Sequence, residues 1–420
     1  MKNKILVIED DADINTLLKK ILERAGYEAE TAFSGTEGRL LLKLNSYDLV
    51  LLDLMLPGLS GEELLTEIRK TLRMPVIALT AKEMCIRDRS NAFHRSGIAC
   101  RIINGLLGLD HTPGISLTEE NTASRPEAIK AWKEIGEWVK AAAVKRELSG
   151  CRFGFLGNTY NGMLDMYSDF TMIQAQTGAH IEILEMCDLN RELSQVTEEE
   201  VLAKKQEILE FFLISEEKAA DPLAQKPTDE QLDWSARVAA AQERLVRDYG
   251  LDALTYYYHG SPGGEYEKLQ SGFIVGHSLL TARGIPCAGE GDLKTCLAMK
   301  ICDILGTGGS FCEIVTVDYE DGTILLGHDG PFHLAIAKGK PILRGMGLYH
   351  GKQGTGVSVE AKVRTGPITN LACTQTIDGR LKFIITEALS TDGPIMTIGL
   401  SLIHILQNCE SRCQYRHGRE

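Results

Sequence analysis

Two hydrophobic patterns alternate along the first 83 residues. The segments KILVIEDD, YEAETA, YDLVLLDLMLP and MPVIALTAK have the composition of strands, whereas INTLLKKILERAG, SGTEGRLLLKLN and EELLTEIRKTL carry apolar residues at helical spacing. Each predicted helix lies between two predicted strands. Strands and helices that alternate in this way predict a parallel sheet wound by right-handed crossovers.

A second pattern fills most of the remaining chain. AIKAWKEIGEWVKAAAVKREL predicts a long amphipathic helix, with Ile129, Trp132, Ile135 and Val139 near helical spacing. Strand and helix patterns then alternate until short strands take over, separated by the turns YEDGT, AKGKP and TIDGR. We therefore expect an α/β domain followed by a mainly antiparallel β domain, with a boundary near 305–310.

Composition narrows the class of protein. A chain of 420 residues has room for two or three domains, and its net charge of −13 does not favour a nucleic-acid-binding surface. We expect a cytoplasmic protein without a membrane segment, because the first residues do not resemble a signal peptide and no apolar stretch reaches spanning length. Most of the eleven cysteines stand alone in apolar runs, which is typical of reduced, buried thiols.

Acidic residues follow the first and third predicted strands. Glu9 and Asp10 come after KILVI, Asp53 ends YDLVLLD, and Thr80 ends the fourth predicted strand. The carboxyl ends of parallel strands meet at one edge of a sheet, so three carboxylates would converge there. A hard dication with oxygen ligands, most simply Mg²⁺, would relieve their repulsion. The alternative is that each acid only caps the helix that follows it.

The segments VIEDD, DLVLLDLMLPGLSG and PVIALTAK together resemble the receiver domain of bacterial response regulators. The resemblance implies a flavodoxin-like α/β fold, a histidine kinase as partner, and Asp53 as the phosphoacceptor. It further implies that Glu9, Asp10 and Asp53, with the backbone carbonyl of Met55, bind Mg²⁺. Thr80 would sense the phosphoryl group.

The receiver pattern stops early. A receiver needs a fifth strand ending in a lysine and then a fifth helix, and neither pattern follows Lys82. The predicted domain is therefore a truncated receiver that covers residues 1–83.

Another set of polar residues surrounds the predicted boundary between the α/β and β segments. Glu290 stands between glycines in PCAGEGD, Glu313 lies in an apolar strand that reads as buried, and His328 follows a predicted strand. Two carboxylates and an imidazole suit Mn²⁺ or Mg²⁺, and they also suit general acid–base chemistry. The alternatives are a turn acid and a hydrogen-bonded surface histidine.

Residues 91–399 resemble the L-fucose/L-arabinose isomerase family through GFLGNTYNGMLDMYSDF, IPCAGEGDLKT, GGSFCEIVTVDYEDGTILLGHDGP and YHGKQGTGVSVEAKVRTGPIT. The resemblance implies that a sugar substrate is converted between aldose and ketose through a cis-enediol, in a homo-oligomer. Glu290 and Glu313 would transfer protons and, with His328, bind Mn²⁺, with Mg²⁺ as the alternative metal.

The same resemblance divides residues 91–399 into three parts, and the chain departs from the family pattern in two ways. Residues 91–147 correspond to the tail of the family's N-terminal α/β domain, 148–308 to its central domain, and 309–399 to part of its β-rich domain. Most of the N-terminal domain and a further metal-binding histidine near the C-terminus have no counterpart. We therefore expect little or no isomerase activity from this chain.

Two short segments mark the ends of these resemblances. One short nucleotide sequence can encode MCIRDR at 84–89, and its reverse complement can encode LSLIHI at 400–405. That nucleotide sequence resembles the mosaic-end adapter of transposase-based sequencing libraries. The pattern predicts a chimeric reading frame, with an artefactual junction at 84–90 and an artefactual tail at 400–420. The alternatives are a signalling protein whose receiver gates an output domain, and a non-catalytic sugar-binding module.

Overall fold

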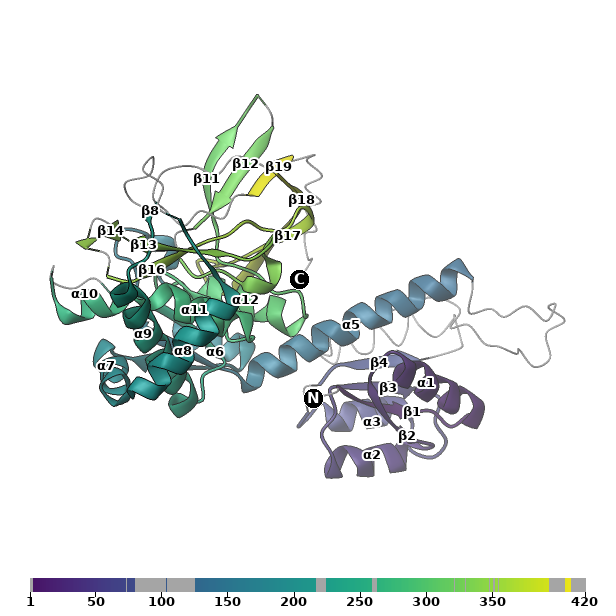
Figure 1. The fold of residues 1–420 in the computed structure, drawn as a ribbon. Coiled ribbons are helices and arrows are strands. Elements are labelled where there is room, and N and C mark those ends of the chain that lie inside the picture. Colours follow the sequence, from purple (N-terminus) through teal and green to yellow (C-terminus); the bar gives the residue numbers. More distant parts are fainter. Residues whose placement is uncertain are drawn as a thin grey trace. The chain divides into compact units, whose positions relative to one another are not determined.

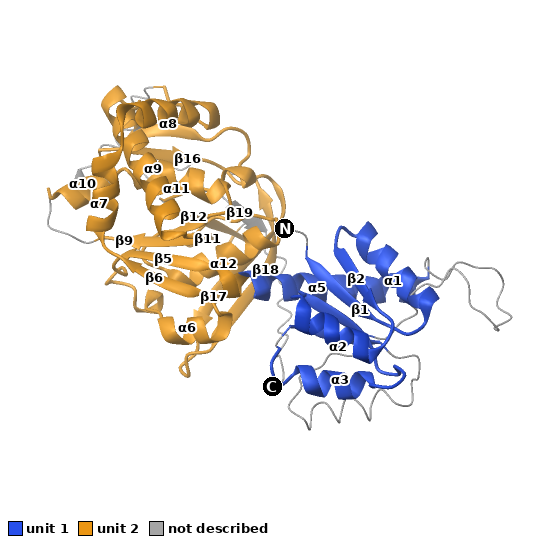
Figure 2. Ribbon diagram, turned by 90° about the horizontal axis from the view of Figure 1, so that it is seen from below, with its two compact units in different colours: residues 1–147 blue, residues 148–420 orange. Residues whose placement is uncertain are grey.

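The computed structural model describes most of the chain: residues 3–72, 74–79, 103, 125–216, 224–258, 263–320, 322–328, 330–346, 348–349, 352–353, 355–392 and 405–408. The chain divides into two compact units, residues 1–147 and 148–420 (Figure 2). Each unit has its own sheets and its own hydrophobic core, and each is described separately below.

Unit 1 contains the predicted alternation of strands and helices. Its elements are β1 (Lys4–Ile8), α1 (Ala12–Arg24), β2 (Glu28–Ala32), α2 (Gly35–Leu44), β3 (Leu49–Asp53), α3 (Gly61–Ile68) and β4 (Val76–Leu79). The strands pair in the order β2-β1-β3-β4, and all three pairings are parallel (Figure 1). The side chains of Asp11, Ser34 and Ser60 accept backbone hydrogen bonds at the N-termini of the three helices, which explains where each helix begins.

The two faces of this sheet are covered by different helices. Alternate residues of β1 and β3 point to opposite faces, so Leu6 and Leu52 pack with α2 and α3, while Ile5 and Leu51 pack with α1. A 25-residue helix, α5 (Pro126–Gly150), completes the second face.

The packing of α5 differs from the sequence expectation. Its buried residues Ile135 and Val139 belong to the same core cluster as β1, β3 and α1. Arg146 also forms an ion pair with Asp48 at 2.9 Å (Nε to Oδ1). The sequence assigns this helix to an isomerase fragment and predicts no fifth helix for the first domain, yet α5 covers the sheet of unit 1. Ile129, expected on the apolar face, is 57% exposed.

Unit 2 begins with a second parallel sheet, in the order β10-β9-β5-β6. Its strands are β5 (Arg152–Gly157), β6 (His180–Leu184), β9 (Ala253–Tyr257) and β10 (Cys287–Ala288). The helices of this unit are α6 (Phe170–Thr177), α7 (Met186–Gln195), α8 (Glu198–Phe211), α9 (Asp229–Tyr249), α10 (Glu265–Gln270), α11 (Phe273–Ala282) and α12 (Leu293–Ile304). Helices α9 and α11 supply much of the largest core cluster.

The remainder of unit 2 is rich in antiparallel strands, as predicted. One sheet has the order β11-β12-β19-β18-β17, formed by Glu313–Asp318, Thr323–Gly327, Ile405–Asn408, Leu381–Thr391 and Gly366–Gln375. The other strands are β7 (Leu213–Ile214), β8 (Ala224–Gln225), β13 (Ile342–Met346), β14 (Leu348–Tyr349), β15 (Lys352–Gln353) and β16 (Val357–Glu360). The pairing of β7 with β13 is parallel. Strand β19 pairs with β12 and β18, although the sequence assigns residues 400–420 to no domain.

Candidate functional site

The acidic site of unit 1 lies where the strands β1 and β3 end. Glu9 and Asp10 follow β1, Asp53 is the last residue of β3, and one carboxylate oxygen from each lies within 4.8 Å of the others. Among the residues that the structure describes, this is the one group of three potential metal-ligating side chains that meets this distance. The parallel topology thus brings Asp53 to Glu9 and Asp10, which lie 44 and 43 positions earlier in the sequence.

Backbone groups hold two of these acids in place. The N–H of Asp11 donates to Glu9 Oε1 at 3.3 Å, and the N–H of Met55 donates to Asp53 Oδ1 at 3.1 Å. Glu9 and Asp53 are buried, whereas Asp10 is exposed. The site is therefore open to solvent on the side of Asp10.

Electrostatic repulsion within the site is strong. Burial, followed by the negative charge of Asp53, raises the pKa of Glu9 to about 7, and the hydrogen bond from the Asp11 backbone opposes this shift. A site that favours a proton on one carboxyl at neutral pH also favours a cation in its place. An all-oxygen donor set suits Mg²⁺.

The roles of two further predicted residues of this site stay predictions. Met55 stands two positions after Asp53, and its side chain is exposed. Thr80 lies outside the described residues, as does the segment in which a fifth strand would follow.

Asn15 is a residue of this site that the sequence interpretation missed. It is fully buried in α1, and its Nδ2 group donates to the carbonyl oxygens of Glu9 and Ala32 at 2.8 and 2.9 Å. A signal was present in the sequence, because Asn15 shares helical spacing with the buried residues Leu18 and Leu22. A polar residue on the apolar stripe of an amphipathic helix indicates a specific hydrogen-bonding role.

The second predicted site lies in unit 2, at the carboxyl end of β10. Glu290 has a φ of 63°, and among the described residues it is the one non-glycine residue with a positive φ. The N–H of Tyr160 donates to the Glu290 carbonyl at 2.9 Å. At the next position, a Cβ on Gly291 would lie 2.4 Å from the carbonyl oxygen of Asn158, so only glycine fits there. The turn that carries Glu290 is therefore closely packed.

Glu313 and His328 come from neighbouring strands. His328 Nδ1 lies 3.9 Å from Glu313 Oε1, and a Cβ on Gly289 would lie 3.0 Å from His328 Nε2. The histidine ring thus packs against the turn that carries Glu290. Within the described part of the chain, however, Glu290, Glu313 and His328 do not form a group of ligand atoms within 4.8 Å of one another.

The prediction that Glu313 lies in a buried strand is wrong. All six residues of β11 are exposed, because β11 lies at the edge of its sheet. A β-branched run predicts a strand but does not distinguish a central strand from an edge strand. His328, by contrast, is buried, with its ring centroid 4.3 Å from that of Phe311.

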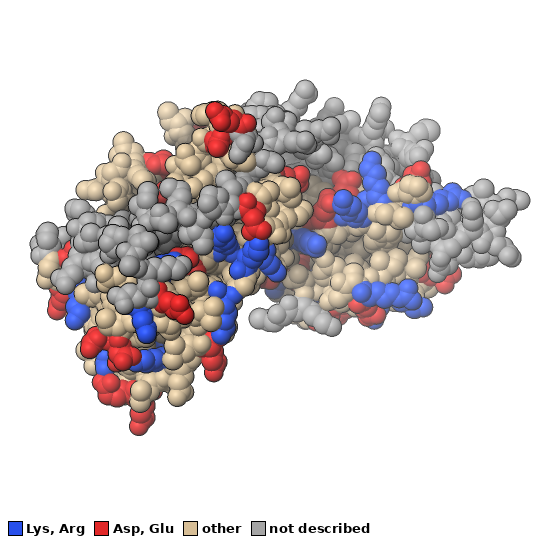
Figure 3. Space-filling model, turned by 45° about the horizontal axis from the view of Figure 1, so that its top comes forward, with Lys and Arg blue, Asp and Glu red and all other residues tan. Residues whose placement is uncertain are grey.

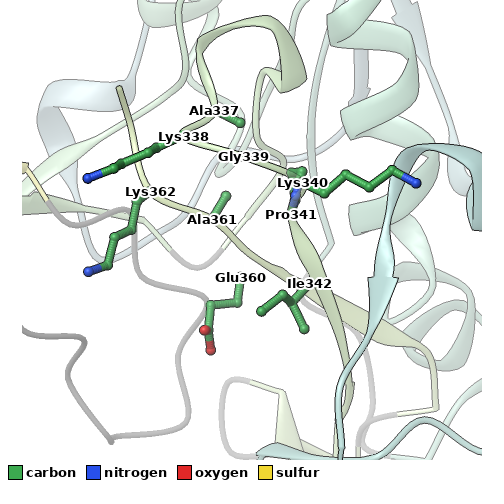
Figure 4. A pocket seen from close by; sticks show the side chains of 9 residues that line it. All are labelled: Ala337, Lys338, Gly339, Lys340, Pro341, Ile342, Glu360, Ala361 and Lys362. Carbon is green, nitrogen blue, oxygen red and sulfur yellow. The ribbon is translucent and has the colours of Figure 1, made fainter. Parts of the chain in front are cut away.

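The surface contributes three further observations. A cavity of about 170 Å³ is lined by residues 337–342 and 360–362, and none of these is a predicted site residue. Among the lysines that line it, Lys338 and Lys362 point to the same side, whereas Lys340 points away (Figure 4). On the face shown in Figure 3, basic and acidic side chains are interspersed. Among the described residues, no helix is both long enough and apolar enough to cross a membrane.

Comparison with known proteins supports the interpretation of the N-terminal segment. The model of the response regulator receiver domain matches residues 5–97, which extends past the boundary at 83 expected from the sequence. The chain is 49% identical over 81 residues to the transcriptional regulatory protein CpxR homolog of Haemophilus influenzae, covering 19% of this chain and 35% of that protein. It is 48% identical over 82 residues to the uncharacterized transcriptional regulatory protein YrkP of Bacillus subtilis, covering 20% and 35%.

The chain is also similar to a solved structure of response regulator TrrA from Thermotoga maritima, with 42% sequence identity and a TM-score of 0.21. The match covers 22% of this chain and 80% of the TrrA chain. The parallel sheet and its acidic edge define the class of the first unit as a flavodoxin-like α/β domain. Residues 5–97 are, more specifically, a response regulator receiver domain. The chain spans about a third of the length of the curated relatives it matches.

Proposed function

We propose that the receiver domain accepts a phosphoryl group on Asp53 from a histidine kinase, with Mg²⁺ held by Glu9, Asp10 and Asp53. The observation that carries this proposal is the group of three carboxylates at the carboxyl edge of the sheet. Bound Mg²⁺ would neutralise charge on the phosphoryl oxygens. The Met55 carbonyl is proposed as a further ligand, and the Thr80 hydroxyl as the group that senses phosphorylation.

The residues of this chain have defined roles in the transfer. A carboxylate oxygen of Asp53 attacks the phosphorus atom, a P–O bond to Asp53 forms, and the bond between phosphorus and the donor breaks, with its electrons leaving on the donor. The N–H of Met55 fixes one Asp53 oxygen at 3.1 Å and thereby orients the carboxylate. The burial of Asp53 limits the access of water to the resulting acyl phosphate.

Incubation with acetyl phosphate and Mg²⁺ is expected to add one phosphoryl group to the full chain, measured by intact mass. Asp53→Asn should remove this addition completely, because an amide is not a nucleophile towards phosphorus. Asp13→Asn, in the exposed first turn of α1, is the matched control and should be phosphorylated like the wild type. Equal phosphorylation of wild type and Asp53→Asn would exclude Asp53 as the acceptor.

For the rest of the chain, we propose that residues 91–399, which include the end of unit 1 and most of unit 2, are a fragment of a metal-dependent aldose–ketose isomerase. The specific observation in favour is the backbone of Glu290: a non-glycine residue in the left-handed region is strained, and such strain concentrates at functional sites. Glu313 begins β11 and His328 directly follows its neighbour β12, with Glu313 Oε1 3.9 Å from His328 Nδ1. The resemblance assigns Mn²⁺ to these three side chains, although their ligand atoms do not all lie within 4.8 Å of one another in this structure. In the proposed site the two carboxylates would move protons between neighbouring carbons of the sugar.

Glu290→Gly tests whether the left-handed backbone at position 290 is strained in order to place the glutamate side chain. We expect this change to raise the free energy of unfolding of unit 2 by about 1 kcal/mol, measured by urea denaturation, because glycine adopts positive φ freely. Glu290→Ala removes the same carboxylate but keeps the strain, so it is the matched control. Both variants should lose any thermal stabilisation by Mn²⁺. A glycine variant that is less stable than the alanine variant would contradict the strain argument.

The wild-type chain is expected to show little or no isomerase activity. Turnover of L-arabinose or L-fucose by this chain would contradict that expectation.

We make two alternative proposals for how the N-terminal domain and unit 2 came to share one reading frame. A chimeric reading frame is supported by the complementary nucleotide sequences that can encode 84–89 and 400–405. A signalling protein whose receiver regulates unit 2 is supported by the packing of α5 on the receiver sheet. Amplification across codons 81–92 from the source DNA distinguishes them, because only a natural fusion yields a product that spans the junction.

A further inference from the structure

We propose that Asn15 is a positioning residue of the phosphoacceptor site: its side-chain amide holds the peptide that joins Glu9 to Asp10 and so aims both acids at Asp53. This inference rests on the proposed phosphoacceptor function. Asn15 is fully buried, and its Nδ2 group donates to the carbonyl oxygen of Glu9 at 2.8 Å. That carbonyl belongs to the peptide unit shared by Glu9 and Asp10.

The second hydrogen bond of the amide connects this peptide to the neighbouring strand. Asn15 Nδ2 also donates to the carbonyl oxygen of Ala32 at 2.9 Å, and that oxygen accepts the N–H of Glu9 at 3.1 Å as well. One side chain of α1 therefore joins the ends of β1 and β2. This cross-link restrains both the peptide before Glu9 and the peptide after it.

The site requires such a restraint for an electrostatic reason. Three carboxylates within 4.8 Å repel one another, and two of them stand on the short connection between β1 and α1. Without a fixed peptide plane, Glu9 and Asp10 would turn away from Asp53 and a cation would have to reassemble them. Groups that orient ligands in this way typically change metal affinity by about 10–100-fold.

Core packing alone does not explain an asparagine at this position. Its Oδ1 atom has no hydrogen-bond partner among the described residues, which costs stability in a buried environment. Leucine has the same number and branching of side-chain heavy atoms and would extend the apolar stripe of Leu18 and Leu22. The retained amide is explained by its two donated hydrogen bonds.

The test measures Mg²⁺ affinity in the full chain. Asn15→Leu should weaken Mg²⁺ binding by about tenfold or more, followed by calorimetry under conditions where the protein is folded. Asn15→Ser retains one donor in a smaller side chain and should weaken binding less. The control is Leu22→Ala, which removes a buried side chain about two turns further along the same helix, and it should lower stability while leaving the affinity unchanged.

The outcomes separate the two proposals. If the wild type shows no saturable Mg²⁺ binding that Asp53→Asn weakens, the phosphoacceptor function fails, and the positioning role fails with it. If the wild type binds Mg²⁺ and both Asn15 variants bind it equally well, only the positioning role is overturned. Equal weakening in Leu22→Ala and Asn15→Leu would reduce Asn15 to a stability residue. A loss confined to the Asn15 variants supports the proposal.

Discussion

Ile135→Asp is expected to lower the free energy of unfolding of unit 1 by roughly 3–5 kcal/mol, which is enough to unfold a marginally stable domain. Ile135 is 4% exposed and packs in one cluster with Ile5, Val7 and Leu49. An aspartate there would bury a charge without a counter-ion against the centre of the sheet. Urea denaturation can follow the loss through the fluorescence of Trp132, which packs against the same cluster.

The control for this prediction stands on the same helix. Ile129 is 57% exposed, so Ile129→Asp should leave the urea midpoint nearly unchanged. Identical midpoints for the two variants would show that α5 does not cover the receiver sheet in solution. In that case residues 1–83 would have to fold without the helix.

Glu9→Gln is expected to remove a pH-dependent loss of stability from the metal-free unit 1. Burial and the charge of Asp53 raise the pKa of Glu9 from 4.5 to about 7, with Asp10 and Asp11 adding to the shift. As the pH rises through this window, the unfolded chain releases the proton first and is favoured. The folded state therefore loses stability from about pH 4.5 upwards, by about 3 kcal/mol once the pH exceeds 7.

Denaturation profiles at several pH values, with and without Mg²⁺, check this prediction. In the wild type, Mg²⁺ should stabilise the protein more at alkaline than at acidic pH, because the cation and the proton compete for the same carboxylates. In Glu9→Gln, the metal-free stability should vary much less across the window. A profile parallel to that of the wild type would mean that another group titrates.

The local elements of unit 1 could be predicted because their signals are short-range. The β-branched runs of β1 and β3 and the N-capping side chains of Asp11 and Ser34 act within a few residues of the backbone that they organise. The convergence of Glu9, Asp10 and Asp53 could also be predicted, because a parallel sheet places the carboxyl ends of its strands together.

Other features depend on which surfaces meet, and no local pattern encodes that choice. The periodicity of α5 predicts an apolar face, yet only packing shows that Ile135 faces the receiver sheet while Ile129 faces solvent. The exposure of β11 likewise follows from its place at a sheet edge.

The sequence by itself determined the helices, the strands and the acidic residues of the receiver domain, since propensity and capping act through neighbouring residues. Only the tertiary structure decided that Asn15 connects β1 to β2 and that Glu290 adopts a left-handed backbone. Both features depend on contacts between segments distant in sequence, and their free energies arise only once those segments are packed together.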